Sequence, residues 1–153
     1  MKVMNRIKLI FCLLCFVPLV GGFAQDSIRN NGMNRFYFPN GKLSSEGLLT
    51  NGKPDGYWKS YYENGKIKSE GNRKNFELDS LWKFYSEEGK LIVEINYRSG
   101  KKNGIKTTWL DKEIMKENFR DDVKEGFTRL YFTDGKLKQE TPFVKGLEQG
   151  FGK

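Results

Sequence analysis

A repeat with a period of about 22–24 residues, which is typical of repeat architectures, runs through most of this chain and constrains its fold more than any other feature. The aromatic residue before each predicted turn recurs at a nearly constant spacing, at Tyr37, Tyr61, Tyr85, Trp109 and Tyr131. An apolar column keeps nearly the same spacing, at Leu43, Ile67, Leu91, Ile114 and Leu137. So does a glutamate column, at Glu46, Glu70, Glu94, Glu117 and Glu140. In such a chain each unit buries its apolar surface against its neighbours.

Each repeat unit predicts a β-hairpin. The second unit, Gly56–Gly71, has an aromatic-rich segment, an Asn-Gly turn and a short apolar/polar alternation. A type I turn closing on a positive-φ glycine with a bulge fits every glycine-containing copy, including the one in which Glu88 precedes Gly89. A second connection, such as Thr50–Asp55, joins each hairpin to the next. We therefore predict an all-β fold, an elongated single-layer antiparallel β-meander of about five stacked hairpins.

Alternation divides the side chains of each first strand between two faces of the predicted sheet. Tyr57 and Tyr61 share one face, and because the equivalent positions of the later units are always apolar, this face is predicted to be the packed one. The other face mixes aromatic and polar residues, and exposed aromatic clusters often mark interaction sites. The residues predicted to contact a partner are Trp58, Tyr62, Trp82 and Phe84.

The fourth unit departs from the pattern. Its segment Trp109–Gly126 has no glycine in the hairpin turn, and the unit is two residues shorter than the others. Taken alone, Lys112–Lys124 has the pattern of an amphipathic helix. Because the columns of the repeat continue through it, we favour strand–turn–strand, with a helix as the alternative, since tertiary context often overrides local propensity.

The N-terminal segment, residues 1–24, differs in composition from the repeats. Lys2, Arg6 and Lys8 precede the twelve-residue apolar segment Leu9–Val20, and Ala24 ends a signal-peptidase site. Residues 1–24 therefore predict a signal peptide, residues 25–34 a flexible arm and residues 35–153 the repeat domain. We expect an exported protein, periplasmic or extracellular. An uncleaved anchor is the weaker alternative, because a membrane-spanning helix needs about 20 apolar residues.

Catalysis and metal binding find no support in the residue types. Cys12 and Cys15 lie within the leader, and each follows a large apolar residue, so lipid anchoring is not expected. After cleavage the chain contains neither Cys nor His, which excludes thiol catalysis and Cys/His metal sites. No nucleophile elbow, phosphate-binding loop or dinucleotide fingerprint is present. We expect no enzymatic activity, no cofactor and no metal.

The charged residues are mixed along the chain, and the formal net charge of +8 falls when the basic leader is removed. This mixture does not favour a nucleic-acid partner, which calls for one basic patch. The glutamate column could bind a cation or a basic partner, but carboxylates on alternate strands lie roughly 9–10 Å apart, too far to share a metal. We favour an exposed ladder in which the glutamates pair across strands with Lys59, Lys83, Lys66 and Lys68.

These residues give the chain a family likeness: it resembles the bacterial variant of the MORN repeat over about residues 35–153. The matching residues are Gly56, Trp58, Tyr61, Tyr62, Asn64, Gly65, Ile67 and Gly71, followed by Trp82, Tyr85, Gly89, Leu91, Tyr97, Gly100 and Gly104. The resemblance implies a twisted sheet of stacked hairpins and a scaffold that binds another protein. Some bacterial members look like antitoxins or immunity proteins. Because MORN repeats elsewhere are linked to phospholipids, the alternative is a module that binds anionic lipid or glycan of the cell envelope.

Overall fold

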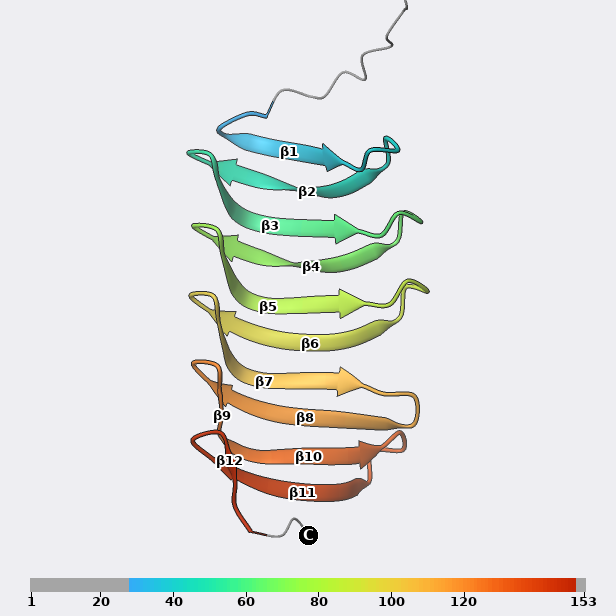
Figure 1. Ribbon diagram of the computed structural model, residues 1–153, viewed down its shortest axis with the longest axis vertical. Coiled ribbons are helices and arrows are strands. Elements are labelled where there is room, and N and C mark those ends of the chain that lie inside the picture. Colours follow the sequence, from blue (N-terminus) through green and yellow to red (C-terminus); the bar gives the residue numbers. More distant parts are fainter. Residues whose placement is uncertain (1–27, 151–153) are drawn as a thin grey trace, which may run out of the picture.

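The computed structural model describes residues 28–150, which form one open antiparallel sheet without a helix. The strands follow one another across the sheet in chain order, except that β9 pairs only with β8 (Figure 1). Their bounds are β1 Gly32–Tyr37, β2 Leu43–Thr50, β3 Lys53–Tyr61, β4 Ile67–Lys74, β5 Glu77–Tyr85, β6 Leu91–Arg98, β7 Lys101–Trp109, β8 Glu113–Arg120, β9 Val123–Lys124, β10 Gly126–Phe132, β11 Leu137–Val144 and β12 Leu147–Glu148. The predicted single-layer β-meander is confirmed. The predicted signal peptide lies outside the described residues.

The structure defines two boundaries that the sequence alone does not. Strand β1 begins at Gly32, three residues before the predicted start of the repeat domain. Gly32 and Met33 pair with Leu49 and Leu48 at the end of β2, and the Asn34 side chain bonds the backbone of Arg29 in both directions, at 2.8 and 3.0 Å. In the fourth unit, Glu113–Arg120 is the strand β8, so the strand–turn–strand prediction is confirmed and the helix alternative is wrong.

The first turn of a hairpin is a type I turn with a bulge, as predicted. In the second unit, Gly65 has φ of 85° and donates its N–H to the Tyr62 carbonyl at 2.9 Å. The Tyr62 N–H donates to the Lys66 carbonyl, and the strand register shifts between Ser60 and Tyr61. Only the glycine needs positive φ in this turn, which explains why Glu88 is tolerated before Gly89.

The second turns have both central residues at positive φ, the geometry of a two-residue type I′ turn. The second central residues are Gly52, Phe76, Gly100, Asp122 and Gly146. Each of these residues donates its N–H to a carbonyl of the preceding unit, at 2.7–3.0 Å. The turns of neighbouring hairpins are therefore joined by backbone hydrogen bonds along one edge of the sheet.

A row of indole rings lying on glycines runs across β2 to β5. Trp58 stands between Gly47 and Gly71 in the strand register, and Gly71 stands beside Trp82. A Cβ atom on Gly71 would lie 2.5 Å from the Trp82 ring, so the indole occupies the space that a side chain would need. The Trp82 indole N–H donates to the Asn72 carbonyl, which lies where the register of β4 and β5 shifts, at 2.7 Å. The ring thus satisfies a carbonyl at the bulge.

The predicted packed face is wrong. We call the face that carries Trp58 and Trp82 the Trp face, and the opposite one the Tyr face. Trp58 and Trp82 are 8% and 4% exposed, whereas Tyr57 is 47% exposed. Alternation separates two faces without saying which one is covered.

The physical reason for the covered Trp face is a bend in the odd-numbered strands. Gly56, Ser80 and Gly104 have φ of 99°, 59° and 105°, and β3, β5 and β7 curve at their first residues (Figure 1). Side chains beyond the bend, those of Leu78 and Tyr97, therefore pack against the buried indole cluster. The predicted interaction face is thus the one that holds the core.

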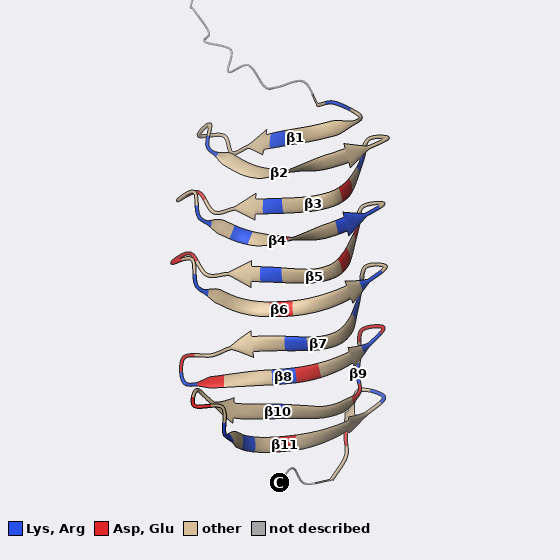
Figure 2. Ribbon diagram, turned by 180° about the vertical axis from the view of Figure 1, so that it is seen from behind, with Lys and Arg blue, Asp and Glu red and all other residues tan. Residues whose placement is uncertain are grey.

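The Tyr face carries a ladder of side chains across ten strands, all of them charged except Thr107. From β1 to β11 it reads Arg35, Glu46, Lys59, Glu70, Lys83, Glu94, Thr107, Lys116, Arg129 and Glu140. Figure 2 shows the basic bands of β1, β3 and β5 one above the other. The pairing with Lys59 and Lys83 is confirmed in register, but Lys66 instead donates to the Glu88 carbonyl and Lys68 lies over Tyr62.

Tyrosines of the Tyr face reinforce this ladder. The Tyr61 hydroxyl donates to Glu46 at 2.7 Å, and the Tyr85 hydroxyl donates to Glu70 at 2.6 Å. Burial, and then the bond to Glu46, raises the pKa of Tyr61 to about 12. The column that was expected to be the core of the sheet therefore fixes carboxylates in place.

One glutamate of the predicted column lies on the opposite face. The β7–β8 hairpin has no register shift, whereas the β3–β4 and β5–β6 hairpins have one. Losing one residue of the bulge moves the side chains of the strand that follows, β8, to the other face. Lys116 therefore takes the ladder position, and Glu117 takes the position that Gly71 has in the second unit.

Replacing Gly71 by alanine tests the indole–glycine contact. Because Gly71 does not have positive φ, the change acts through the clash with Trp82 alone, and we expect a loss of about 1–3 kcal/mol in the free energy of unfolding. Urea unfolding followed by fluorescence measures it. In a Trp82→Val background the same alanine should cost substantially less; an equal cost in both backgrounds would contradict the contact.

Phe76 occupies a turn position that suits glycine. Its φ of 75° is disfavoured for a bulky residue, and its side chain is half exposed, so Phe76→Gly loses little burial. We expect the free energy of unfolding to rise by about 0.5–1 kcal/mol. This is the strain relieved at the left-handed position, reduced by the entropy that glycine loses on folding. Asn75→Gly is the control, because Asn tolerates this region and should gain less. A loss of stability in Phe76→Gly would refute the assignment of strain.

Candidate functional site

The Trp face contains a hollow whose floor is made of serines. Ser45, Ser60 and Ser69 are adjacent across β2, β3 and β4, and the Oγ atoms of Ser60 and Ser69 lie 2.7 Å apart. Phe36 on β1 and Phe84 on β5 stand at the two ends of the same row. Three small side chains between two large ones leave a depression along the sheet.

The indole rings form one wall of this hollow. The rings of Phe36 and Trp58 have centroids 6.1 Å apart and are stacked, and those of Trp82 and Phe84 are 6.2 Å apart. An open hollow of about 300 Å³, which we call the serine hollow, lies here. Its lining residues are Ser45, Pro54, Trp58, Lys59, Ser60, Arg73 and Trp82. The Arg73 guanidinium lies 5.3 Å from the Trp82 ring and brings a positive charge to the rim.

Tyr62 belongs to a neighbouring hollow at the first-turn edge. Its hydroxyl donates to the Tyr85 carbonyl at 2.7 Å, and the ammonium group of Lys68 lies 5.6 Å from its ring. This hollow has a volume of about 540 Å³, and Glu63 and Glu87 give it acidic groups. It is distinct in composition from the serine hollow.

Of the predicted partner-binding residues, Trp58 and Trp82 line the serine hollow, Phe84 lies against Trp82 at the end of the serine row, and Tyr62 lines the other hollow. Contact of any of them with a partner stays a prediction, and the two indoles offer little free surface. Sequence reasoning missed Phe36 and the serine floor. The repeat itself holds the signal, since Phe36, Ser60 and Phe84 occupy the same position in three successive units.

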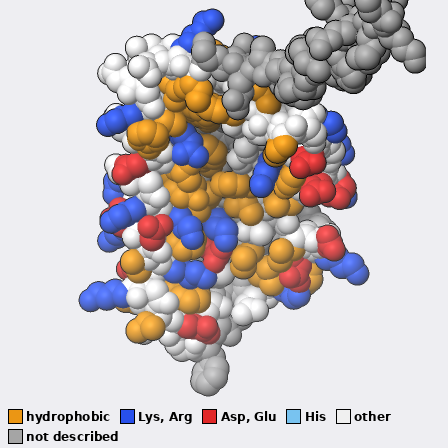
Figure 3. Space-filling model, turned by 45° about the horizontal axis from the view of Figure 1, so that its top comes forward, with side chains coloured by type: hydrophobic (Ala, Val, Ile, Leu, Met, Phe, Trp, Pro, Cys, Tyr) orange, Lys and Arg blue, Asp and Glu red, His pale blue; other side chains and the backbone are white. Residues whose placement is uncertain are grey.

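The row of the Trp face that contains Gly71 and Trp82 becomes ionic beyond Ile95. Glu117 is 6% exposed and pairs with Lys106 at 2.9 Å and with Lys124 at 2.6 Å. Burial disfavours the charged carboxylate, but the hydrogen bonds and charges of the two lysines outweigh it, so the pKa of Glu117 is lowered. Together with Arg73 and Lys102, these side chains make the Trp face basic, and Figure 3 shows Lys and Arg among its hydrophobic side chains.

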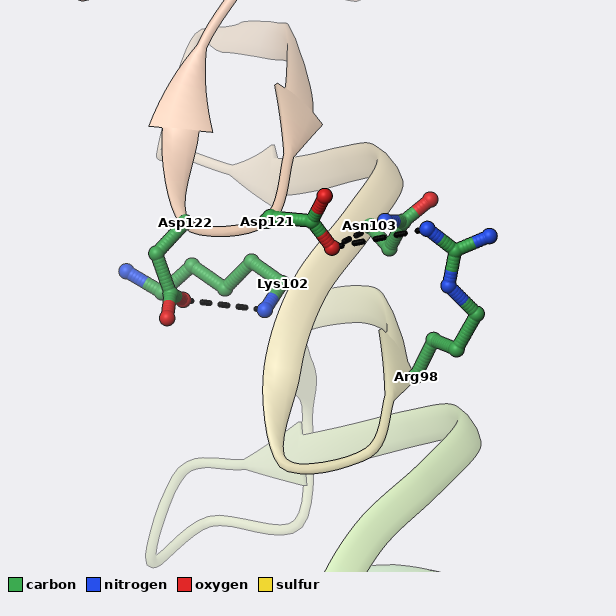
Figure 4. Close-up of polar contacts among 5 residues, drawn as sticks. All are labelled: Arg98, Lys102, Asn103, Asp121 and Asp122. Carbon is green, nitrogen blue, oxygen red and sulfur yellow. Dashed lines mark hydrogen bonds and ion pairs between the residues drawn. The ribbon is translucent and has the colours of Figure 1, made fainter.

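Asp121 and Asp122 are the two central residues of the turn that follows β8, and they bind residues of β6 and β7. Asp121 accepts hydrogen bonds from Asn103 at 3.1 Å and from Arg98 at 3.4 Å, and Asp122 accepts the backbone N–H of Lys102 at 2.9 Å (Figure 4). All of these side chains lie near the surface. Their arrangement joins two turns and leaves no carboxylate directed at an empty site.

The described residues, 28–150, lack two features that would point to other functions. Within that range no group of three or more Asp, Glu, His or Cys side chains could hold a metal ion. The same residues include no helix long and apolar enough to cross a membrane.

A comparison with protein families gives one match. A family model described as the MORN repeat variant matches residues 30–51, 54–75, 78–99 and 124–145, together more than half of the chain. Each matched segment corresponds to one hairpin, and the unmatched residues 100–123 contain the hairpin without a bulge. A search of the curated proteins found no match.

Replacing Glu117 by glutamine tests the ionic cluster. Two lysines would lose their shared carboxylate, and we expect a loss of roughly 2 kcal/mol at pH 7, because the ammonium groups keep partial contact with water. The lowered pKa of Glu117 means that its contribution is present above about pH 4.5 and is lost as the pH falls through the folded value. Wild-type and variant unfolding curves should therefore converge in acid.

Glu140→Gln is the matched control for this experiment. Glu140 pairs with Arg129 on the more exposed Tyr face, so its loss should cost less than about 1 kcal/mol. Equal losses for the two variants at pH 7, or parallel pH profiles for wild type and Glu117→Gln, would contradict the proposed role of the cluster.

Proposed function

Because the chain belongs to the MORN repeat variant family, we propose that it is a non-enzymatic scaffold that binds another protein through the Trp face. MORN repeats are in general protein- or membrane-binding modules, and the family is a non-catalytic repeat module. The observation that carries the proposal is the serine hollow, which is assembled from three successive repeats. No single hairpin could form it.

The hollow has the features of a protein-binding pocket. Its volume of about 300 Å³ suits one large apolar side chain of a partner. The two indoles in its wall are held in place by packing, so they lose little conformational entropy on binding, and a pocket for a buried anchor is where binding energy concentrates. Arg73 at the rim adds a donor for a carbonyl or carboxylate beside that anchor.

We further propose that the protein acts after export. The support is the basic, apolar and small-residue order of residues 1–24, which is that of a secretory signal peptide. An antitoxin or immunity role is the narrowest form of the proposal. It is supported by the likeness to bacterial MORN variants alone, and fold-level likeness is a weak guide to function.

A second candidate function is binding to the cell envelope. Its support is a set of basic residues on the Trp face, Arg73, Lys102, Lys106 and Lys124. The carboxylate of Glu117 offsets part of their charge. Such a surface attracts anionic lipid or glycan. Sedimentation with phosphatidylglycerol vesicles that is lost on changing Arg73 and Lys102 to glutamine would favour this function.

Filling the hollow tests the protein-binding function. Ser60→Phe should fold, because Phe36 and Phe84 occupy the equivalent position in the first and third units. We expect capture of the partner from the producing cells to fall about tenfold or more, a loss of roughly 1.4 kcal/mol in binding. Affinity purification after crosslinking in those cells, with quantitative mass spectrometry, measures it.

Thr133→Phe is the control, since it places the same aromatic side chain at an exposed position of the β10–β11 turn, away from the serine hollow. It should leave the captured proteins unchanged. If Ser60→Phe captures the same proteins in wild-type amounts, the serine hollow is not the binding site.

A further inference from the structure

The Tyr face carries a line of exposed apolar side chains beside its charged ladder. We call this line the apolar ribbon; its members are Met33, Leu48, Tyr57, Leu81, Ile105 and Phe127. They are 40–53% exposed, and every odd-numbered strand of the main path from β1 to β7 contributes one, as does β10. Exposed apolar side chains that recur in one line across the sheet, rather than scattered singly, favour an interaction surface.

The spacing within the ribbon is regular. Opposite three of its members the neighbouring strand presents an asparagine: Tyr57 faces Asn72, Leu81 faces Asn96 and Ile105 faces Asn118. Apolar ridges therefore alternate with polar positions, about 9–10 Å apart along the sheet. A partner that fits must repeat with the same period.

The ladder beside the ribbon adds a condition on charge. Its first six members alternate strictly, Arg35, Glu46, Lys59, Glu70, Lys83 and Glu94. The complementary surface must alternate with the same period and the opposite phase. A second copy of this ladder, read in reverse order, sets opposite charges against each other at three of the five kinds of rung.

We propose that two copies of this chain pack back to back through their Tyr faces, around a two-fold axis parallel to the strands between β5 and β6. The interface around such an axis is isologous, and the strands of the partner copy follow one another in the opposite order across it. It sets Arg35 against Glu140, Glu46 against Arg129, and Lys83 against Glu94. Of the other rungs, Glu70 meets Thr107, and Lys59 meets Lys116 as the one like-charged pair.

The same axis interdigitates the ribbons. Leu81 of each copy lies against Asn96 of the other, Ile105 against Asn72, and Tyr57 against Asn118. Apolar ridges thus enter the polar positions between the ridges of the other copy. A two-fold axis along the length of the sheet would instead keep each strand at its own level and oppose like charges throughout, which is costly across an interface.

The dimer leaves both Trp faces outward. It therefore does not depend on the proposed partner-binding function, and it presents two serine hollows on opposite sides of one assembly. Two outward sites raise avidity for a partner that is itself repeated.

Sedimentation equilibrium of the purified protein tests the dimer. We expect twice the chain mass for wild type, and a dissociation constant at least about tenfold weaker for Ile105→Asp. Leu147→Asp is the matched control, because Leu147 is also exposed but lies in β12, outside the ribbon. A monomeric wild type, or equal weakening by both variants, would overturn the proposal.

The strand order is tested by crosslinking an equal mixture of ¹⁴N- and ¹⁵N-labelled chains with a short amine-reactive reagent. The proposed axis brings Lys59 of one copy to Lys116 of the other, so we expect mixed-isotope crosslinks between these two residues. Within one chain they lie on β3 and β8, several strands apart. Mixed-isotope crosslinks only between Lys59 and Lys59, or attachment of a monomer to anionic vesicles through the ribbon, would refute it.

Discussion

The indole ring laid on a glycine of the preceding strand is the contact on which the rest of this sheet depends. A single layer has no second layer to cover it, so apolar surface must be buried by side chains of the sheet itself. Trp82 does this by occupying the space above Gly71 and by bonding the carbonyl at the bulge. The bend at Gly56 and its equivalents then brings the second-turn side chains over the rings. Core, bulge and bend are parts of one arrangement.

The two faces of the sheet divide the chemistry of the chain between them. The Trp face buries its aromatic residues and leaves a serine-floored depression between them. The Tyr face exposes its apolar side chains and orders its carboxylates with tyrosine hydroxyls. Because every strand contributes to both faces, a contact on one side is held by the same backbone that shapes the other.

The period, the hairpins and the type of the first turns could be read from the sequence, because glycine at positive φ and a fixed spacing of columns are local signals. The covered face could not. Tyr57 and Trp58 alternate in the same way whichever side the strand bends toward, and the bend depends on backbone geometry at Gly56 and Ser80. The face on which Glu117 lies could not be predicted either. The spacing of the glutamate column does not show that the fourth hairpin lacks a bulge. The serine hollow needed register across three hairpins, which spacing within one unit does not supply.

The missing bulge of the fourth hairpin has a consequence for how such a chain can change over time. A substitution alters one side chain, but the loss of one residue in a turn exchanges the two sides of a strand at once. In this protein that exchange sets Glu117 between Lys106 and Lys124 in the row where other units place glycine and tryptophan. The strand keeps its neighbours and its backbone hydrogen bonds, while the side chains of its two faces are exchanged. Short insertions and deletions in the turns are therefore a route by which a repeat sheet can acquire a new surface without losing its fold.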